Sequence, residues 1–258
     1  MRSSLAISVS VWKALVLREA LARLFSRRAA WFWLLFEPIV HIAFLMLLFL
    51  TIRVRHVGGI ETPLWIMIGL CTFFFFTRTE RQASNAVSAN RALFAYRQVK
   101  PVDGVFARSV LEGVIMTVVS VLIFSLAGFY GFRVLPVDSL QLLATLLAMW
   151  LIGAGFGMLS CVAEELTPEL GRLLGMLNRP LYLASGLIFP IGSLPPAYRE
   201  VLMLNPLAHG LELARLSFAP YYHAVPGTSL SYLWLWGAGL LLAGLLFQVG
   251  FAKRLVMQ

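Results

Sequence analysis

The sequence predicts an all-α polytopic membrane protein with six transmembrane helices. Composition is the first reason: 60% of the 258 residues are hydrophobic and 13% are charged, whereas about a quarter of the residues in a soluble domain are charged. The second reason is that the apolar residues gather in blocks of about 20, the length of a helix that crosses the hydrocarbon core. The third is an aromatic content of 13%, which excludes a disordered chain.

Residues 1–30 are predicted to form an amphipathic cytoplasmic helix at the membrane surface. Basic residues interrupt the whole segment, so it lacks the uninterrupted apolar core of a cleavable signal peptide. One helical stripe carries apolar residues, namely Leu17, Leu21, Leu24 and Phe25. Arg18, Arg23 and Arg27 lie at or beyond the edges of that stripe. A solvated basic tail is the alternative interpretation.

We expect the six spans at residues 31–52, 63–89, 109–130, 139–162, 168–190 and 230–251. A helix of about 22 residues is roughly 33 Å long and therefore crosses a core about 30 Å thick. The fifth span depends on where it begins, because residues 181–192 alone are too few to cross.

Thr167, Pro168 and Glu169 supply the start of the fifth span. A threonine N-cap, a proline at the first helical position and an acid in the first turn are typical of a helix N-terminus. A helix that begins there places Arg179 near the middle of the membrane.

Residues 192–229, between the fifth and sixth spans, are expected to form a periplasmic re-entrant region. Their two proline-delimited pieces, 197–204 and 206–218, are each too short to cross the membrane. We therefore predict short re-entrant or interfacial helices there.

The distribution of lysine and arginine predicts that both termini are cytoplasmic. Fifteen of the 21 basic residues lie on the side of the termini and five on the opposite side, and basic loops stay in the cytoplasm. Topology thereby explains the net charge of +9, so we expect no nucleic-acid partner. Cys71 and Cys161 both lie in apolar blocks, and no disulfide framework is implied.

No catalytic or metal-binding set stands out in the sequence. The four histidines lack a metal-ligand spacing, and neither a phosphate-binding glycine motif nor a nucleophile elbow occurs. We expect no cofactor and no ATPase on this chain, so active transport would draw on a partner or an ion gradient. Gly153, Gly155 and Gly157 are expected to allow close helix packing. A membrane-embedded lipid-linked sugar transferase is the alternative from another class, although Glu164-Glu165 is the only adjacent acidic pair.

Several local patterns occur in a fixed order along the chain, namely Asn90-Arg91-Ala92-Leu93, Val99-Lys100-Pro101, Ser185-Gly186-Leu187-Ile188-Phe189-Pro190, Ser193-Leu194-Pro195 and Leu204-Asn205-Pro206-Leu207-Ala208-His209. With the basic N-terminal helix, they resemble the membrane subunit of type-2 ABC exporters. Within that class they are similar to the capsular polysaccharide export permeases of Gram-negative bacteria. The resemblance covers essentially the whole chain.

The resemblance implies a homodimer in the bacterial inner membrane whose two copies enclose one translocation path. Each copy would dock on a cytoplasmic ABC ATPase, so two ATPase subunits would hold ATP and magnesium. The implied substrate is a polysaccharide, acidic and lipid-linked, that passes on to a periplasmic adaptor and outer-membrane export proteins. Exporters of O-antigen or teichoic-acid polymers, or of small hydrophobic drugs, are the alternatives within the transporter class.

Residues 90–100 would act as the coupling helix in that family, and the N-terminal helix, with Arg18, Arg23 and Arg27, as a gate. The expected ATPase contacts are Asn90, Arg91, Phe94, Tyr96, Arg97 and Lys100. Phe94 and Tyr96 offer apolar anchors between basic residues, and aromatic residues and arginine are typical of interface hot spots. An ordinary basic cytoplasmic loop is the alternative.

The substrate pathway is expected where polar residues would be costly to leave in lipid. Two helical faces qualify, one in the first span with Trp33, Glu37, His41 and Phe44, the other in the fifth with Arg179, Tyr182, Ser185 and Phe189. Aromatic rings stack against sugar faces, and Arg179 suits an acidic polymer. The structural alternative is that Glu37 and Arg179 pair with each other or hold helices together.

Overall fold

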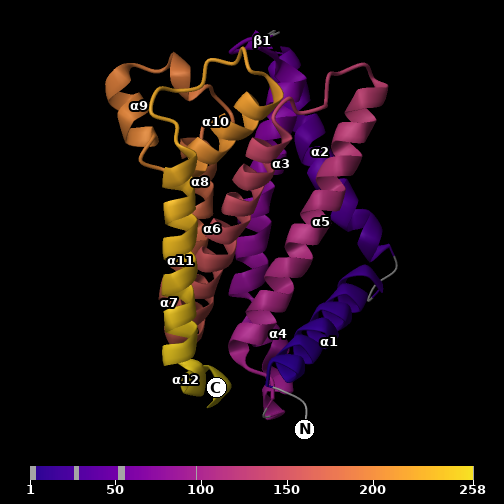
Figure 1. The fold of residues 1–258 in the computed structure, drawn as a ribbon, viewed down its shortest axis with the longest axis vertical. Helices are drawn as coiled ribbons and strands as arrows, with labels where there is room; N and C mark the ends of the chain where they lie inside the picture. The colour runs from indigo at the N-terminus through magenta and orange to yellow at the C-terminus, as the bar shows by residue number, and fades with distance from the viewer. Residues whose placement is uncertain (1–3, 26–28, 52–55, 97, 258) are drawn as a thin grey trace.

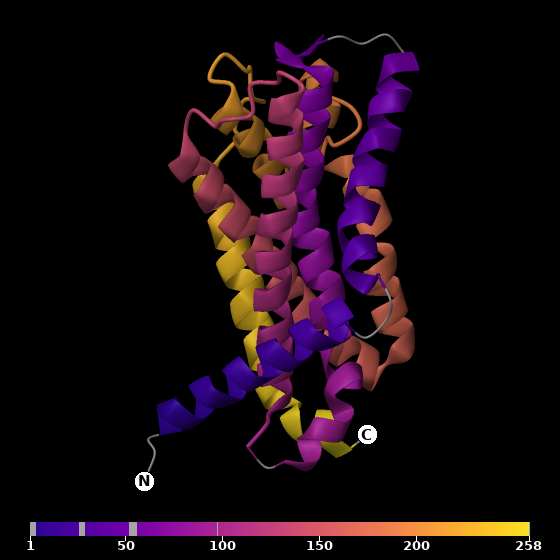
Figure 2. The ribbon, with the colours of Figure 1, turned by 90° about the vertical axis from the view of Figure 1, so that its right-hand side faces the viewer.

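The computed structural model describes residues 4–25, 29–51, 56–96 and 98–257, and these ranges are almost entirely helical. Within these ranges, five helices are long and apolar enough to cross a membrane, and they run side by side along the long axis of the molecule (Figures 1 and 2). They are α2 (Ala30–Thr51), α3 (Thr62–Ser84), α5 (Pro101–Phe129), α6 (Ser139–Leu166) and α11 (Leu230–Gly250). The all-α polytopic class is confirmed, whereas the count of six spans stays a prediction.

The prediction of one continuous helix over residues 168–190 is wrong. The segment forms two short helices, α7 (Pro168–Met176) and α8 (Asn178–Ala184). Pro180 explains the break, because it has no N–H to donate to the carbonyl four residues earlier and its ring crowds that carbonyl. Gly186 then ends α8 with a positive φ of 71°, a conformation that glycine adopts without strain. Figure 1 places α7 toward the end with the chain termini and α8 toward the opposite end.

The other corrections lie near residues 84–101. The second span, α3, ends at Ser84, and a short helix α4 (Ala86–Asn90) follows after Asn85. Instead of a helix over residues 90–100, the chain forms a 3-10 turn, η1 (Arg91–Ala95). The third span begins at Pro101, eight residues earlier than expected. Asp103 stabilises that start, since its carboxylate accepts the Lys100 N–H at 2.9 Å.

Helix α3 is the centre of the protomer and packs most closely against α6. Small residues of α6 make this approach possible: a Cβ atom on Gly153 would lie 2.5 Å from the Phe76 carbonyl oxygen, and one on Gly157 would lie 2.7 Å from that of Glu80. A Cβ on Gly155 would collide with the backbone of α11 at Leu241. The prediction that these glycines allow close packing is confirmed.

The end opposite the termini is covered by η2 (Ile191–Ser193), α9 (Pro196–Leu202) and α10 (Pro206–Phe218), in the region predicted to be re-entrant (Figure 1). We call α9, α10 and the loop to Ser229 the cap. A two-residue hairpin of β1 (His56–Val57) and β2 (Ile60–Glu61) lies at the same end.

A buried polar network around Arg215 of α10 connects the cap to α3. The fully buried guanidinium group of Arg215 stacks 3.6 Å from the Trp65 ring centre and donates to Glu212 at 3.1 Å and to the Gly186 carbonyl at 2.9 Å. Glu212 in turn accepts the Tyr222 hydroxyl at 3.0 Å. Burial raises the pKa of Tyr222 to about 12, so the hydroxyl stays protonated and remains a donor. The network joins α10 to α3 and to the turn that ends α8.

Candidate functional site

The face of α2 that was predicted to line a path is open. Trp33 is 61% exposed and Phe44 is 63% exposed, and they belong to a cavity of about 640 Å³ lined by Trp33, Phe36, Glu37, Val40, His41 and Phe44. Large aromatic side chains on an open concave face are suited to stacking against a partner or a ligand.

A hydrogen bond brings the two predicted path faces together. A ring nitrogen of His41 lies 2.9 Å from the Tyr182 hydroxyl, which links α2 to α8. Phe73 of α3 packs edge-on against Tyr182, with ring centres 5.4 Å apart. His41, Phe73 and Tyr182 therefore form an aromatic cluster that joins α2, α3 and α8.

The carboxylate of Glu37 pairs with Arg78 of α3 at 2.9 Å, and not with Arg179. The structural alternative of a Glu37–Arg179 pair is therefore wrong in this structure. Arg78 also lies over the Phe74 ring, 5.6 Å from its centre. Sequence reasoning missed Arg78 as the partner, although a charged residue on the second span was the signal that could have indicated it.

The predicted residues of the fifth segment separate into different environments. Arg179 is exposed and lines a polar cavity at the end with the termini. Ser185 is fully buried, and its hydroxyl donates to the Leu181 carbonyl, so it caps α8 from inside. Phe189 is half-buried in the turn after Gly186. The structure thus groups Tyr182 with the α2 face and turns Ser185 away from it.

The predicted coupling residues are divided between the interior and the surface. Phe94 is 8% exposed and packs in a cluster with Ala83, Val87, Val105 and Cys161. Asn90 is 3% exposed, accepts a hydrogen bond from Arg18 and donates to the Ala86 carbonyl at 2.8 Å. Neither side chain can serve as an exposed docking anchor.

Three of the predicted coupling residues remain at the surface: Tyr96 is 66% exposed, Lys100 is exposed, and Arg91 is exposed while pairing with Glu165 at 2.6 Å. Arg97 lies outside the described residues. The surface available for docking is therefore the tip around Tyr96, and Phe94 supports it from inside.

Helix α1 (Ser4–Phe25) lies obliquely across the bundle at the end with the termini and packs on α5 (Figure 2). Its predicted apolar stripe faces away from the protein, with Leu17 62%, Leu21 52% and Phe25 71% exposed. This orientation is the one expected of a helix that lies in a membrane surface with its apolar face in lipid.

The opposite face of α1 carries charges that pair with α5. Arg23 forms an ion pair with Glu112, and Glu19 accepts from Arg23 at 3.4 Å and from Arg108 at 2.6 Å. The Trp12 indole donates to Asp103 at 2.7 Å. Arg27, the third predicted gate residue, lies outside the described residues. Sequence reasoning missed Glu19, and its spacing of four residues from Arg23 was the available signal.

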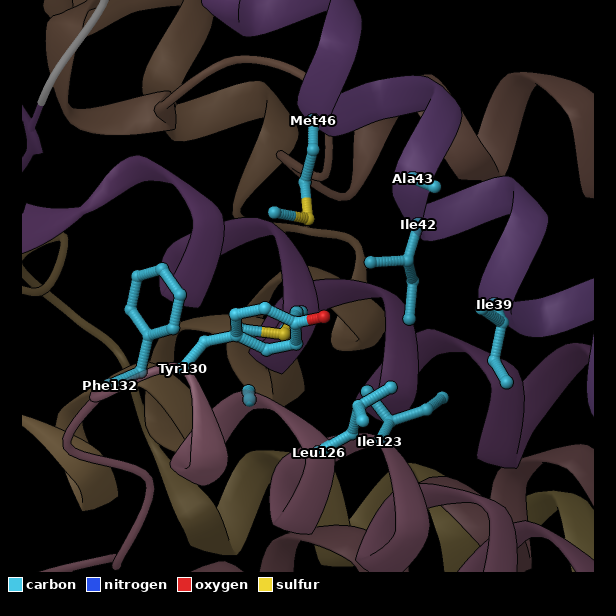
Figure 3. Close-up of a pocket in the computed structure, with 10 residues that line it drawn as sticks. Ile39, Ile42, Ala43, Met46, Ile123, Leu126, Tyr130 and Phe132 are labelled. Atoms are coloured by element: carbon cyan, nitrogen blue, oxygen red, sulfur yellow. The ribbon is translucent and has the colours of Figure 1, made fainter.

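Another cavity, of about 510 Å³, lies between α2 and the end of α5 and is lined almost entirely by apolar side chains. Figure 3 shows Ile42 and Met46 of α2 extending toward Ile123, Leu126 and Tyr130. The Tyr130 hydroxyl is the one polar side-chain group among the lining residues and cannot replace the hydration of a sugar, so this groove is unsuited to a polysaccharide.

Comparison with known proteins gives a consistent result along the chain. Residues 10–219 match the family model described as ABC-2 type transporter. The chain is 34% identical over 232 residues to the polysialic acid transport protein KpsM of Escherichia coli, which covers 90% of each protein. It is 25% identical over 252 residues to the capsule polysaccharide export inner-membrane protein BexB of Haemophilus influenzae, covering 98% of this chain and 95% of BexB. For the corresponding protein CtrC of Neisseria meningitidis serogroup B, the identity is 26% over 215 residues, covering 83% and 81%.

Proposed function

Because this chain belongs to the ABC-2 type transporter family and, within it, to the capsule polysaccharide export inner-membrane permeases, we propose that it forms the membrane channel of an ATP-driven exporter of capsular polysaccharide. The observation that carries this proposal is the similarity to KpsM over 90% of both chains. That relative is a polysialic acid transport protein, which supports an acidic polymer as the substrate class. No observation favours a sugar transferase.

The channel is formed by two copies of the chain. Exposed aromatic side chains on α2, above all Trp33 and Phe44, support this, because one protomer leaves them uncovered. Two such faces opposite one another would enclose a path lined by rings that stack against sugars and by the Glu37–Arg78 pair. A polymer can slide along such a surface without tight binding.

Energy comes from a separate ATPase, and two copies of it hold ATP and magnesium. The tip around Tyr96 and Lys100 is exposed. It follows α4 at the end of the bundle where both chain termini lie (Figure 1), and this end therefore offers a docking surface to the ATPase. The basic loops of the sequence support a cytoplasmic position for this end. The cap then faces the periplasm, where an adaptor and outer-membrane export proteins receive the polymer.

Deletion of the gene tests the proposal against the enzyme alternative. Cells that lack the chain are expected to make the polymer and to accumulate it in the cytoplasm, and restoring the wild-type chain is expected to return it to the surface. Immunological detection of the polymer on intact and on permeabilised cells measures both pools. Loss of polymer from both pools, together with loss of synthesis in membrane extracts, would contradict the proposal.

The Glu37–Arg78 pair gives a test of the path. Glu37→Gln and Arg78→Gln are each expected to lower surface polymer several-fold, because the proposed path needs both charges. If the pair were only structural, the double variant would restore export, since neither charge would be left unpaired. Surface polymer in the two single variants and the double variant distinguishes the two roles, and recovery in the double variant would contradict the path assignment.

A further inference from the structure

A polar cavity lies at the end of the bundle that carries the chain termini. It has a volume of about 510 Å³ and lies between the last turns of α3 and α6 and the segment α7–α8. In contrast to the apolar groove of Figure 3, its lining includes three arginines, Arg81, Arg172 and Arg179. A volume in this range is typical of a small-molecule site.

The charge of the cavity favours an anion. Two carboxylates, Glu80 and Glu164, accompany the three arginines, so the lining carries a formal excess of one positive charge. Glu80 already accepts a hydrogen bond from the Asn178 side chain at 2.9 Å. Among the described residues, no carboxylate forms an ion pair with Arg179, whereas Arg172 pairs with Glu169 at 3.2 Å on the exposed surface of α7.

Two buried polar atoms at the cavity have no protein partner. Ser160 is 3% exposed and lines the cavity, and its hydroxyl makes no hydrogen bond within the described part of the chain. The same holds for the Asn178 side-chain oxygen. Buried polar atoms are costly to leave unpaired, so these two atoms indicate a polar occupant that the chain itself does not supply.

The outer surface of α7 beside the cavity is apolar. Leu173 is 61% exposed and Met176 is 63% exposed, and both lie between cavity-lining residues in the sequence. An occupant with a charged end in the cavity could therefore lay acyl chains along α7. The packing of α7 leaves room for it, because a Cβ on Gly175, which lines the cavity, would meet no atom within 4 Å.

We propose that this cavity binds the phosphate group of a lipid headgroup, with Arg172 and Arg179 as the phosphate-binding residues. The planar arginine fork matches phosphate oxygens in a bidentate manner, and Ser160 supplies a hydroxyl donor. The inference deepens the proposed function and rests on it for its purpose: a lipid-linked polymer would present its phosphate-bearing lipid end here before transport. An ordinary anionic phospholipid carries the same chemistry.

Lipid binding to the full chain with its ATPase measures the proposal directly. We would reconstitute the complex in phosphatidylcholine nanodiscs that contain phosphatidylglycerol, and count bound lipids by native mass spectrometry. Arg179→Gln and Arg172→Gln are each expected to weaken phosphatidylglycerol binding at least tenfold. Gly175→Leu, which keeps every charge but fills the open space, is expected to have a similar effect. Matched controls are Gly175→Ala and Arg254→Gln, an arginine at the same end outside the cavity, and both are expected to stay within twofold of wild type.

Further arms separate the sources of the phosphate. Inorganic phosphate at millimolar concentration is expected to compete only weakly, because it lacks the acyl chains that pack on α7. Purified lipid-linked polymer is expected to displace phosphatidylglycerol from the wild-type complex. If inorganic phosphate binds as tightly as the lipid, the lipid part of the proposal is overturned. Unchanged phosphatidylglycerol binding in all three cavity variants, or an equal loss in Arg254→Gln, overturns the site.

Failure of the inference and failure of the proposed function give different results. If only the cavity assignment is wrong, the wild-type complex still exports polymer and the cavity variants bind phosphatidylglycerol normally. If only the export function is wrong, deletion leaves the surface polymer unchanged while the cavity variants still lose lipid binding.

Discussion

Helices α2 and α3 follow one another in the chain, and both are long and apolar enough to span a membrane. They differ in burial, because α2 is mostly exposed and α3 is mostly buried against the rest of the chain. Only 24% of the apolar stretch of α2 is buried against the rest of the chain, compared with 83% for α3. The more hydrophobic helix of the two is α2, the exposed one. In a soluble protein the order would be reversed, because water selects apolar residues for the interior.

The membrane explains this inversion. Side chains that face lipid must be apolar, whereas a helix inside the bundle can carry polar groups that protein neighbours satisfy. Helix α3 accordingly buries Glu80, whose carboxylate accepts a hydrogen bond from the Asn178 side chain at 2.9 Å. Most side chains of α3 therefore contribute to the stability of the protomer, whereas most side chains of α2 do not contact the rest of the chain. In the proposed function, the exposed side chains of α2 contact the polymer and the second copy.

The largest effect is expected where the cap is fastened to α3. Arg215→Met removes a fully buried cation and leaves the Glu212 carboxylate without its ion-pair partner. Breaking a buried ion pair in this way lowers the free energy of unfolding by about 3–5 kcal/mol. Unfolding of the purified chain in detergent, followed by tryptophan fluorescence, measures the loss. Arg199→Met, on α9 in the same cap, is the control and should change stability by less than about 0.5 kcal/mol. A loss below about 1 kcal/mol in Arg215→Met would show that the network does not stabilise the fold.

The same contrast of buried and exposed side chains recurs between Phe94 in η1 and Tyr96 directly after η1. Phe94→Ala empties a buried site and is expected to cost about 3 kcal/mol of stability. Tyr96→Ala removes an exposed ring and should leave stability within about 0.5 kcal/mol while weakening the ATPase interaction. Detergent unfolding and co-purification of the ATPase measure the two effects. Equal stability losses in both variants would contradict the burial of Phe94 against the exposure of Tyr96, and ATPase binding at wild-type strength in Tyr96→Ala would contradict the docking role of Tyr96.

The smallest effect on stability, under about 0.5 kcal/mol, is expected on the open face of α2. Trp33→Ala combined with Phe44→Ala removes two side chains that one protomer leaves exposed, so the purified protomer should unfold as the wild type does. Surface polymer, by contrast, should fall several-fold. Phe129→Ala is the control: it removes a ring at the end of α5, away from the α2 face, that is 89% exposed. This variant should export polymer normally. Normal export by the α2 double variant would remove α2 from the path.

Long hydrophobic blocks made most of the helices predictable. The limits of α2, α6 and α11 agree with the expected spans within a few residues because each block is bounded by polar residues or turns. Pro180 was also visible in the sequence, and it argued against a continuous fifth helix. The length of residues 168–190 favoured one spanning helix, but the missing N–H of Pro180 breaks it into α7 and α8.

Partners across the fold could not be predicted, because they depend on how each helix is rotated. Glu37 could meet a cation on the second or on the fifth segment, and only the packing of α2 on α3 selects Arg78. The pair of Arg23 and Glu112 joins residues 89 positions apart. Phe94 and Tyr96 look alike in the sequence, and the fold of η1 alone decides that Phe94 lies inside.

The break between α7 and α8 has a consequence for ion leakage. Since Pro180 donates no hydrogen bond, the Met176 carbonyl lacks its usual helical partner, and backbone of this kind persists at membrane depth only where protein or water supplies a donor. If water supplies that donor, it has to reach the break from the end with the termini, toward which α7 lies (Figure 1). The barrier that keeps the resting exporter from leaking ions has to lie beyond that point, where the Tyr182 hydroxyl meets His41 and the Tyr182 ring packs on Phe73.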